Sequence, residues 1–456
     1  MATVKIHFLG AASTVTGSKY YLETPGMNIM VDCGIFQGLK ELRLQNWQPL
    51  PVQADKIGVV LLTHGHLDHT GYLPRLVKEG FKGQIIGTAP TLSITAIILR
   101  DSAKIHEEEA EQANKMGYSS HDPALPFYTL KEAERAIDLF QAEDKDQWIF
   151  LSDTIKYRFR FNGHIIGATF VELEILGKLF VFSGDIGRKV DALMDAPNRP
   201  QWADFLFLES TYGNRLHPKE NVEEIVIGLV ERTVHEKGQL IIPSFAVERL
   251  QSLIYLFWNL YKKNRIPNIP IFVDSPMGNN VLSVFENYTQ WHKLSMSDYK
   301  AMCHHVNIIT SYKDTWKTID DPRPKIVIAG SGMITGGRVL TYLDQLIDEP
   351  ATTVLLVGYM AEGTRGRQLL EGAHELKFFG KYRPVNAKVA HLESLSAHAD
   401  QQELLDWLKE IKNIPEKVFL IHGEPTALDA FRTKIRDSYR WNVHIPKLYE
   451  VVEIVI

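Results

Sequence analysis

Four potential metal ligands lie within six residues in the segment Thr63-His64-Gly65-His66-Leu67-Asp68-His69-Thr70. Imidazole nitrogens and carboxylate oxygens are the donors that hold zinc and similar divalent ions in proteins. The segment directly follows the apolar residues 59–62, which predict a strand. The spacing therefore predicts a metal site on a loop that a rigid strand presents.

Further acids and histidines share this setting, because each follows an apolar run and precedes a glycine or a turn. They are Asp32, His164, Asp185, Glu209 and His422. Taken singly, a turn-forming acid or a hydrogen-bonded histidine explains each of them better than a functional role. Together with the histidine-rich loop they exceed what structural use would explain, so we expect these side chains to converge on one site.

The number of candidate ligands indicates two metal ions. The candidates are His64, His66, Asp68, His69, His164, Asp185 and His422. Four ligands on one short loop cannot all reach one tetrahedral ion without crowding. A carboxylate such as Asp185 could bridge two ions. Two ions about 3.5–4 Å apart would share a hydroxide and clamp a transferring phosphoryl group.

Composition limits the class of protein. The 456 residues suffice for two or three domains, and 45% hydrophobic with 23% charged residues is typical of a soluble globular chain. A net charge of −5 gives no general attraction to nucleic acid, so a polyanion site would be a local one. Two cysteines give no disulfide framework, and no apolar run reaches the length of a membrane span. We expect a cytoplasmic protein without membrane association.

The order of elements predicts an inserted domain. Residues 1–209 are rich in short β-like runs, interrupted by helical patterns at 90–116 and 129–141. From about Pro218 strands and helices alternate strictly, which is typical of a doubly wound parallel sheet. Metal-type residues return after residue 390. We therefore expect one α/β domain from residues 1–209 and 391–456, with residues 210–390 inserted as a parallel α/β domain. The elements expected in the insertion are strands 239–242, 271–273, 325–329 and 353–357 and helices 222–236, 246–262, 279–290 and 337–347.

Three strand-to-helix turns of the insertion are candidate substrate contacts, because open α/β sheets usually bind ligands there. The glycine-rich turn at residues 329–338 would present backbone N–H groups to an anion, although such turns are common. The turns at 243–246 and 358–365 occupy equivalent positions. Their side chains could hold phosphates or stack on bases, but core packing explains the aromatic ones equally well. The candidates are Ser244, Phe245, Ser331, Gly332, Arg338, Tyr359 and Arg365.

One stretch of the insertion is locally basic. Residues 363–390 contain six lysines and arginines against two glutamates. From charge alone, a solvated basic face explains the stretch as well as a polyanion site does.

The chain resembles metallo-β-lactamase-fold hydrolases of the β-CASP family, which process nucleic acid, over essentially its full length. Asp32, the His64 to His69 segment, His164 and Asp185 in Ser-Gly-Asp match the four general motifs. The three β-CASP motifs match Glu209 in Leu-Glu-Ser-Thr-Tyr-Gly, His398 in Ser-Ala-His-Ala-Asp and His422 in Ile-His-Gly-Glu. In style the chain is similar to the endonuclease subunit of the eukaryotic cleavage and polyadenylation specificity factor and its bacterial relatives. The resemblance implies an αββα sandwich with an inserted β-CASP domain.

The resemblance also implies a role for each site residue. One zinc would take His64, His66 and His164, the other Asp68, His69 and His422, with Asp185 bridging. Asp32 would fix a ligand or the hydroxide through a hydrogen bond. His398 would touch the scissile phosphate and act as the general acid, oriented by Glu209. The catalytic set is thus Asp32, Asp68, Asp185, Glu209 and His398. Histidine at position 422 is typical of members that act on RNA, whereas the DNA-directed branch typically has valine.

We therefore predict a zinc-dependent endoribonuclease that hydrolyses single-stranded RNA with two Zn²⁺ per chain. The nucleophile would be a two-zinc-activated hydroxide, and His398 would be the general acid. Mn²⁺ or Fe²⁺ would tolerate the same ligands. Two other functions stay open: hydrolysis of small thioesters or lactones at the same centre, and a non-catalytic RNA-binding subunit. An additional 5′ exonuclease activity and a homodimer are also left open.

Overall fold

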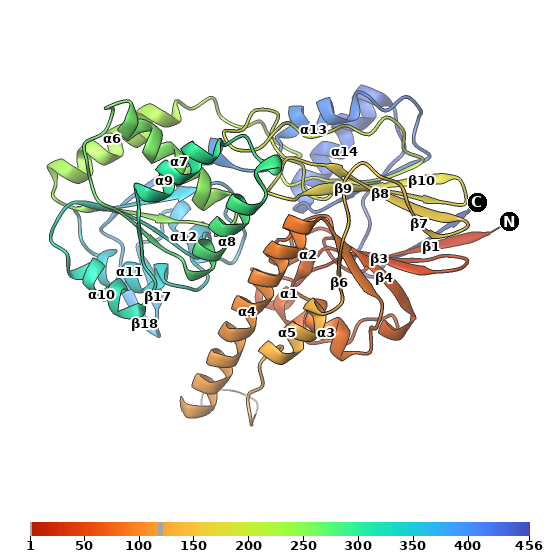
Figure 1. The fold of residues 1–456 in the computed structure, drawn as a ribbon, viewed down its shortest axis with the longest axis horizontal. Helices are drawn as coiled ribbons and strands as arrows, with labels where there is room; N and C mark the ends of the chain where they lie inside the picture. Colours follow the sequence, from red (N-terminus) through yellow and green to blue (C-terminus); the bar gives the residue numbers. More distant parts are fainter. Residues whose placement is uncertain (1, 117–121) are drawn as a thin grey trace. The chain divides into compact units, whose positions relative to one another are not determined.

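The computed structural model of the chain describes residues 2–116 and 122–456. It forms two compact units, drawn in Figure 1. Unit 1 contains residues Met1–Leu216 and His398–Ile456, and unit 2 contains His217–Ala397. The domain limits expected after residues 209 and 390 lie near these dividing points, and the exact limits remain a prediction.

Unit 1 is built on two seven-stranded sheets. The first has the order β22 (Val451–Val455), β1 (Thr3–Phe8), β2 (Lys19–Glu23), β3 (Asn28–Cys33), β4 (Ile57–Leu61), β5 (Gln84–Gly87), β6 (Phe140–Ala142). The second has the order β21 (Val443–His444), β20 (Lys417–Ile421), β11 (Phe205–Glu209), β10 (Lys178–Phe182), β9 (Thr169–Ile175), β8 (Ile155–Phe161), β7 (Ile149–Ser152). The inward side chains of both sheets form one apolar core, in which the Phe182 and Phe207 rings stack with centroids 4.0 Å apart.

Helices cover the outer face of each sheet, which confirms the predicted αββα sandwich (Figure 1). On the first sheet lie α2 (Leu67–Thr70), α3 (Leu73–Lys78), α4 (Ala89–Met116) and α5 (Leu130–Ile137), with the short α1 (Lys40–Gln45) nearby in the chain. On the second lie α13 (Gln401–Leu408) and α14 (Pro425–Tyr439). The helices α3, α4, α5, α13 and α14 bury apolar side chains against their sheets, as amphipathic patterns require.

One expected helix is shorter than its sequence pattern indicated. The helix expected at residues 129–141 begins with the predicted capping box of Thr129 and Glu132 but ends at Ile137. Phe140 to Ala142 instead form β6, which pairs in parallel with Ile85 to Gly87 of β5. The hydrogen bonds of an otherwise open sheet edge outweigh the helical propensity of these residues.

Unit 2 contains the expected parallel sheet. Its six strands have the order β14 (Asn307–Ile308), β13 (Ile271–Asp274), β15 (Lys325–Ala329), β12 (Gln239–Pro243), β16 (Thr352–Val357), β19 (Lys388–Leu392), and every neighbouring pair is parallel. The helices of the unit are α6 (Val222–His235), α7 (Arg249–Lys262), α8 (Pro276–Asn287), α9 (Met296–His304), α10 (Tyr312–Asp320), α11 (Val339–Leu346) and α12 (Arg365–Leu370). Ser275 caps α8 and Pro276 occupies its first turn, so this helix begins before residue 279, where it was expected.

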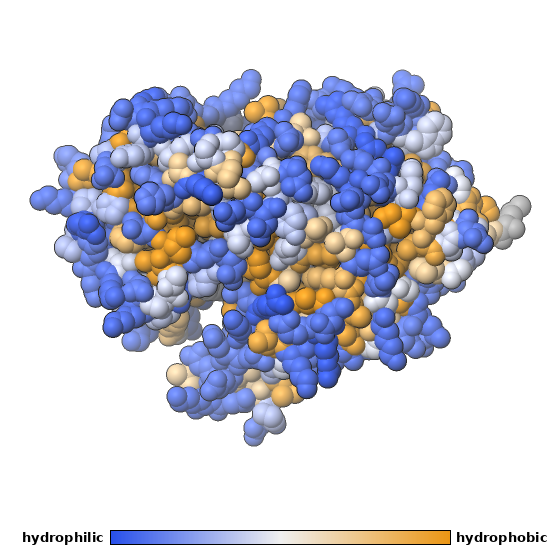
Figure 2. Space-filling model, in the orientation of Figure 1, coloured by the Kyte–Doolittle hydropathy of each residue, from blue (hydrophilic) through white to orange (hydrophobic). Residues whose placement is uncertain are grey.

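A two-stranded hairpin, β17 (Glu375–Phe378) and β18 (Lys381–Pro384), lies outside this sheet. The alternation of residues 218–357 gave no indication of this hairpin, of α9 or of α10. The face of the molecule in Figure 2 is mainly hydrophilic, with smaller apolar areas between the polar ones. Among the described helices, none is both long enough and apolar enough to cross a membrane.

Candidate metal centre

The histidine-rich loop lies between β4 and α2, at the carboxyl end of an interior strand of the first sheet of unit 1. His64 and His66 belong to the loop, and Asp68 and His69 to the single turn of α2. A Cβ atom at Gly65 would lie 2.6 Å from the Ile94 side chain, so only glycine lets the loop pack this closely on α4. The loop thus holds both pairs of ligand candidates on a tightly packed base.

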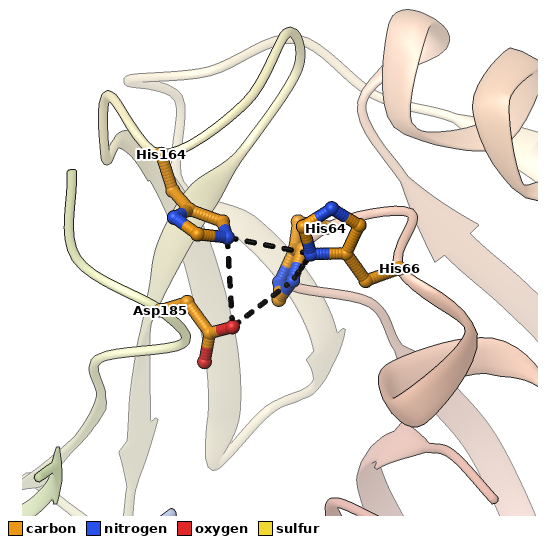
Figure 3. A group of neighbouring side chains, drawn as sticks. All are labelled: His64, His66, His164 and Asp185. Carbon is orange, nitrogen blue, oxygen red and sulfur yellow. Dashed lines mark hydrogen bonds and ion pairs between the residues drawn. The ribbon is translucent and has the colours of Figure 1, made fainter. Parts of the chain in front are cut away.

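His64, His66, His164 and Asp185 form the first cluster (Figure 3). One candidate donor atom of each lies within 4.8 Å of the others. His64 Nε2 is 3.1 Å from His66 Nδ1, and His164 Nε2 is 3.3 Å from the same His66 nitrogen. The three imidazoles come from two segments about a hundred residues apart, and all point toward the Asp185 carboxylate. Such a convergence of lone pairs is what a divalent cation requires.

Asp68, His69 and His422 form the second cluster. His422 Nε2 is 3.3 Å from Asp68 Oδ2, and His69 Nε2 is 3.7 Å from the same oxygen. Asp185 faces both clusters, because its Oδ2 lies 3.4 Å from His64 Nε2 while its Oδ1 lies 3.3 Å from His69 Nε2. The structure therefore brings together all seven residues that the sequence singled out as candidate ligands.

Burial sets the charge of these groups. Desolvation lowers the pKa of His64 to about 3 and that of His66 to about 4, and it also lowers the pKa of His164. These imidazoles are therefore neutral near pH 7, which is the form that binds a metal. For His69, burial also opposes the charged form, but the carboxylates of Asp185 and Asp32 raise its pKa. The first cluster thus offers three neutral imidazoles, whereas the carboxylates around His69 favour its charged form.

The donor set fits a divalent metal. Asp185 is only 2% exposed. Its Oδ1 atom is buried and accepts no hydrogen bond from the described residues. A buried carboxylate oxygen without a donor is costly unless a cation neutralises it. His and Asp ligands in this arrangement suit Zn²⁺, Mn²⁺ or Fe²⁺.

Asp32 orients the second cluster through a hydrogen bond to His69. Its Oδ2 accepts a hydrogen bond from His69 Nδ1 at 2.8 Å, and its carboxylate also accepts hydrogen bonds from Thr63 N and Thr63 Oγ1, both at 2.8 Å. Asp32 is the penultimate residue of β3 and has a φ of +56°, a conformation that aspartate tolerates better than most residues. With Nδ1 bound to Asp32, His69 Nε2 faces Asp185 and Asp68.

His398 and Glu209 form a third group with Asp185. His398 Nδ1 lies 3.4 Å from Glu209 Oε1, and the Glu209 side chain is fully buried. Glu209 is held in turn by the backbone N–H groups of Ile186, at 2.5 Å, and Thr211, at 3.3 Å. Burial opposes the charged imidazole, but the Glu209 carboxylate raises the pKa of His398. His398 is thus a protonatable group beside the clusters, and its side chain is 17% exposed.

The glycine-rich turn of unit 2 follows β15. Ser331 Oγ accepts hydrogen bonds from Thr335 N and Gly336 N at 3.0 and 3.1 Å, so its hydroxyl shapes the turn. Gly332 is buried, and a Cβ there would lie 2.6 Å from the Phe245 ring. The Arg338 guanidinium lies 4.4 Å from the centroid of the Tyr312 ring and donates to Thr315 Oγ1 at 2.9 Å.

The other two turns place their candidates differently. Ser244 is buried and donates to Phe245 O at 3.0 Å, whereas Phe245 is 37% exposed. Tyr359 is half-buried. Arg365 donates through Nε to Lys377 O at 2.7 Å and through Nη1 to Ile334 O at 3.2 Å. Two of its nitrogens are therefore occupied by backbone carbonyls.

Several neighbours of the site were missed by sequence reasoning. Ser18 Oγ lies 3.3 Å from His69 Nε2, and Thr211 Oγ1 lies 3.1 Å from His422 Nδ1. In unit 2, sequence reasoning also missed Tyr312, which is 47% exposed and whose ring stacks with the Arg338 guanidinium. Thr211 could have been found from its place two residues after Glu209. Ser18 and Tyr312 carry no local signal, because only the tertiary fold brings them to these positions.

Family models match three segments of the chain. Residues 14–152 match the model described as metallo-beta-lactamase superfamily, and residues 250–369 match the Beta-Casp domain. Residues 382–446 match the model described as Zn-dependent metallo-hydrolase RNA specificity domain.

Curated relatives match over most of the chain. A ribonuclease of Thermus thermophilus is 32% identical over 427 residues, which cover 92% of this chain and 93% of that protein. The cleavage and polyadenylation specificity factor 73 of Drosophila melanogaster is 29% identical over 96% of this chain, which spans 62% of the longer fly protein. A crystal structure of an Enterococcus faecalis protein of unknown function shares the fold, with a TM-score of 0.54 and 12% identity over 99% of this chain and 100% of that one. The chain therefore belongs to the β-CASP family of the metallo-β-lactamase superfamily.

Proposed function

We propose that this protein is a metal-dependent ribonuclease that hydrolyses single-stranded RNA, mainly at internal phosphodiester bonds. The names of the bacterial ribonuclease and of the fly cleavage factor support this substrate class, as does the RNA specificity domain matched by residues 382–446. The two ligand clusters of unit 1 support the metal dependence. The absence of a described membrane-spanning helix and the scarcity of cysteine support a cytoplasmic location. A further 5′ exonuclease activity stays open.

We assign two Zn²⁺ ions to the clusters. His64, His66 and His164 would hold one, Asp68, His69 and His422 the other, and Asp185 would face both. When bound, such a pair of ions supplies an activated water and neutralises the phosphoryl oxygens. Asp32 orients His69 through the 2.8 Å hydrogen bond to Nδ1. Its task is to keep Nε2 aimed at the metal position.

His398 is the proposed proton donor. The Glu209 carboxylate raises the pKa of His398 against the effect of burial, so it favours the protonated imidazole. Because Glu209 faces Nδ1, we assign Nε2 as the nitrogen that gives its proton to the leaving oxygen. The alkoxide that leaves when a phosphodiester is cleaved is a strong base and needs such a proton.

The Glu209–His398 pair is the observation that carries the choice of reaction. A thioester releases a thiolate, whose conjugate acid has a pKa of about 8.5, so it leaves without a proton donor. A ribose alkoxide does not. A buried glutamate that favours the protonated form of a histidine beside Asp185 therefore supports phosphodiester cleavage over thioester hydrolysis.

In unit 2, the turns after β12, β15 and β16 are the proposed substrate-binding segments. Ser331, Gly332 and Arg338 would hold phosphates with the backbone N–H groups of their turn. Phe245 and Tyr359 would contact bases, and Ser244 would support Phe245. Arg365 would connect segments of the binding surface through its two carbonyl contacts.

A cleavage assay tests the proposal. The purified protein should cut a 5′-labelled single-stranded RNA of mixed sequence at internal positions, and the His66→Ala, Asp68→Ala double variant should lose this activity by at least about a thousandfold because both clusters lose a ligand. Unchanged cleavage by the double variant would show that the activity arises elsewhere.

Controls separate the alternatives. His235→Ala removes an exposed histidine of unit 2 that belongs to no cluster, so it should cleave as the wild type does. A thioester and a lactone offered in parallel should be poor substrates. If either is hydrolysed efficiently while RNA is not, the centre belongs to a small-molecule hydrolase. Binding of RNA without cleavage or metal would point to a non-catalytic subunit.

A further inference from the structure

The hairpin of β17 and β18 exposes an aromatic residue at its tip. Phe379 and Gly380 form the two-residue turn between the strands, with φ values of +46° and +85°. Positive φ at both positions is the type I′ turn that favours Asn-Gly or Asp-Gly. Phenylalanine pays a steric penalty in this conformation, and here its side chain is 63% exposed. A turn optimised for folding alone would not carry this residue.

The hairpin has one apolar and one aromatic-basic face. Leu376 and Phe378 point inward and are buried in the core of unit 2. Lys377 lies directly opposite Tyr382 across the strands, and its Nζ is 5.5 Å from the centroid of the Tyr382 ring. Tyr382 is 62% exposed. Two aromatic rings and a lysine therefore share the solvent side of a hairpin whose other side anchors it.

The charge near the tip of the hairpin is positive, with a lysine on each face. Lys381 lies opposite Phe378 across the strands, so it projects from the other face than Lys377 and Tyr382. Lys377 and Lys381 are exposed, and neither has a carboxylate within ion-pair distance in the described part of the chain. Arg383 is paired with Asp344 at 2.9 Å and Arg367 with Glu371 at 2.6 Å, so these arginines are neutralised locally. Glu375, on the same face as Lys377 but at the far end of β17 from the turn, is the one exposed acid on the hairpin strands. Two lysines are therefore left for an anionic partner.

Arg365 joins the hairpin to the glycine-rich turn. One side chain donates to the carbonyl of Lys377 in β17 and to the carbonyl of Ile334 in the turn at residues 330–338. Gly366 N donates to Met333 O of the same turn at 3.1 Å. The hairpin is thus continuous with a segment to which we have assigned phosphate binding.

We propose that the exposed tip of this hairpin, with Phe379 in the turn and Lys377, Lys381 and Tyr382 beside it, is a binding site for single-stranded RNA. Phe379 and Tyr382 stack on successive bases, and the two lysines contact the phosphates between them. Exposed aromatic rings beside unpaired cations are what binds single strands without sequence preference. The inference rests on the proposed function, since it extends the RNA-binding surface of unit 2 beyond its glycine-rich turn.

The binding test uses protein that cannot cut. In the His66→Ala, Asp68→Ala background, the affinity for a fluorescent single-stranded RNA of about twenty nucleotides is measured by anisotropy. Phe379→Asn with Tyr382→Ser should weaken binding about tenfold or more through the loss of stacking. Asparagine suits the positive φ at the turn, so the hairpin should fold at least as well as in the wild type. Circular dichroism checks this.

A charge variant gives an independent readout. Lys377→Gln with Lys381→Gln should reduce the slope of log affinity against log salt by about 1.4, since each of the two phosphate contacts to a single strand contributes roughly 0.7. Trp202→Ser, which removes an exposed aromatic side chain of unit 1, is the matched control and should bind as the parent does.

The outcomes separate this inference from the proposed function. Unchanged affinity and unchanged salt slope in the two hairpin variants would overturn the hairpin site even if the wild type cleaves RNA. Weakened binding would support it even if no cleavage were found. A shift in oligomeric state by light scattering, with RNA affinity intact, would also overturn it and assign the hairpin to self-association.

Discussion

Asp32 and His69 form a 2.8 Å hydrogen bond that determines which nitrogen of the imidazole faces the candidate metal centre. Since the carboxylate can only accept, His69 must donate from Nδ1, and its Nε2 lone pair is left for a metal. The same carboxylate accepts two hydrogen bonds from Thr63, the residue before the histidine-rich loop. One buried aspartate therefore fixes both the loop and the tautomer of a ligand.

Asp32→Asn should impair metal binding more than folding. The amide keeps the shape of the carboxylate but places an N–H group opposite His69 Nδ1, which forces the proton onto Nε2. We expect zinc affinity at the second cluster to fall about 10–100-fold, as for other residues that orient a ligand. Competition with a fluorescent chelator measures it. Asp55→Asn changes an exposed aspartate and should leave zinc affinity unaltered. Equal affinities for all three proteins would remove Asp32 from the support of the centre.

His398→Ala should separate the two halves of the reaction. Cleavage of RNA should fall about 10²–10⁴-fold, the usual contribution of a general acid. Hydrolysis of bis(p-nitrophenyl) phosphate should fall far less, because nitrophenolate leaves without a proton. Metal content should stay unchanged. An equal loss on both substrates would mean that His398 positions the phosphate rather than protonating the leaving group.

Metal removal should destabilise unit 1. Without ions, His66 Nδ1 lies 3.1 Å from His64 Nε2 and 3.3 Å from His164 Nε2, so ring nitrogens face one another beside Asp185 with no cation between them. At a metal concentration of about 100 times the dissociation constant, each bound ion adds roughly 2.7 kcal/mol to the free energy of unfolding. Calorimetry before and after chelation should show a lower Tm for the apoprotein that zinc restores. The double ligand variant should show no such difference.

Lys19 gives a pH dependence away from the metal centre. It is 2% exposed, its Nζ donates to Gly34 O at 2.6 Å, and burial lowers its pKa from 10.5 to about 8. Between these pH values the unfolded chain binds more protons than the folded one, so the contribution of Lys19 to stability rises with pH. Relative to Lys19→Met, the wild type should gain about 3 kcal/mol of unfolding free energy from pH 8 to pH 10.5, the energetic equivalent of this pKa difference.

Urea unfolding of the two proteins across this range measures the effect. The pKa of Cys33, which burial raises to about 12, affects both proteins and largely cancels in the comparison. A constant difference in stability between wild type and variant would show that Lys19 keeps its ordinary pKa in the folded chain.

The sequence predicted the parts of the fold that hydrophobic periodicity records. The parallel sheet of unit 2 follows from apolar strands such as Lys325–Ala329, buried on both faces, and from the helices between them. The two-sheet sandwich followed from the family resemblance rather than from periodicity. The extent of α5 was wrong, because the pairing of Phe140 with Ile85 is a tertiary contact that no local pattern reveals.

For the candidate site, residue type and strand-end position were sufficient to select the seven ligand candidates and Glu209. Their division into clusters depends on distances that span the chain, such as that between Asp68 and His422. The residues that orient these ligand candidates were harder to predict from the sequence. Ser18 reaches His69 only because β2 and β3 meet with a register shift next to Lys19. The sequence did not predict the hairpin turn, because Phe379 occupies the first turn position, where asparagine or aspartate usually precedes the glycine.

The source of the oxygen added to the cleaved bond is the most direct test of a metal-dependent phosphodiesterase. Single-stranded RNA is cut in H₂¹⁸O by the zinc-loaded wild type and by the His66→Ala, Asp68→Ala variant, and the products are weighed by mass spectrometry. One ¹⁸O atom should appear in each new terminal phosphate of the wild-type products. The variant should yield no labelled product. A 2′,3′-cyclic phosphate without label, formed equally by both proteins, would contradict hydrolysis at this centre.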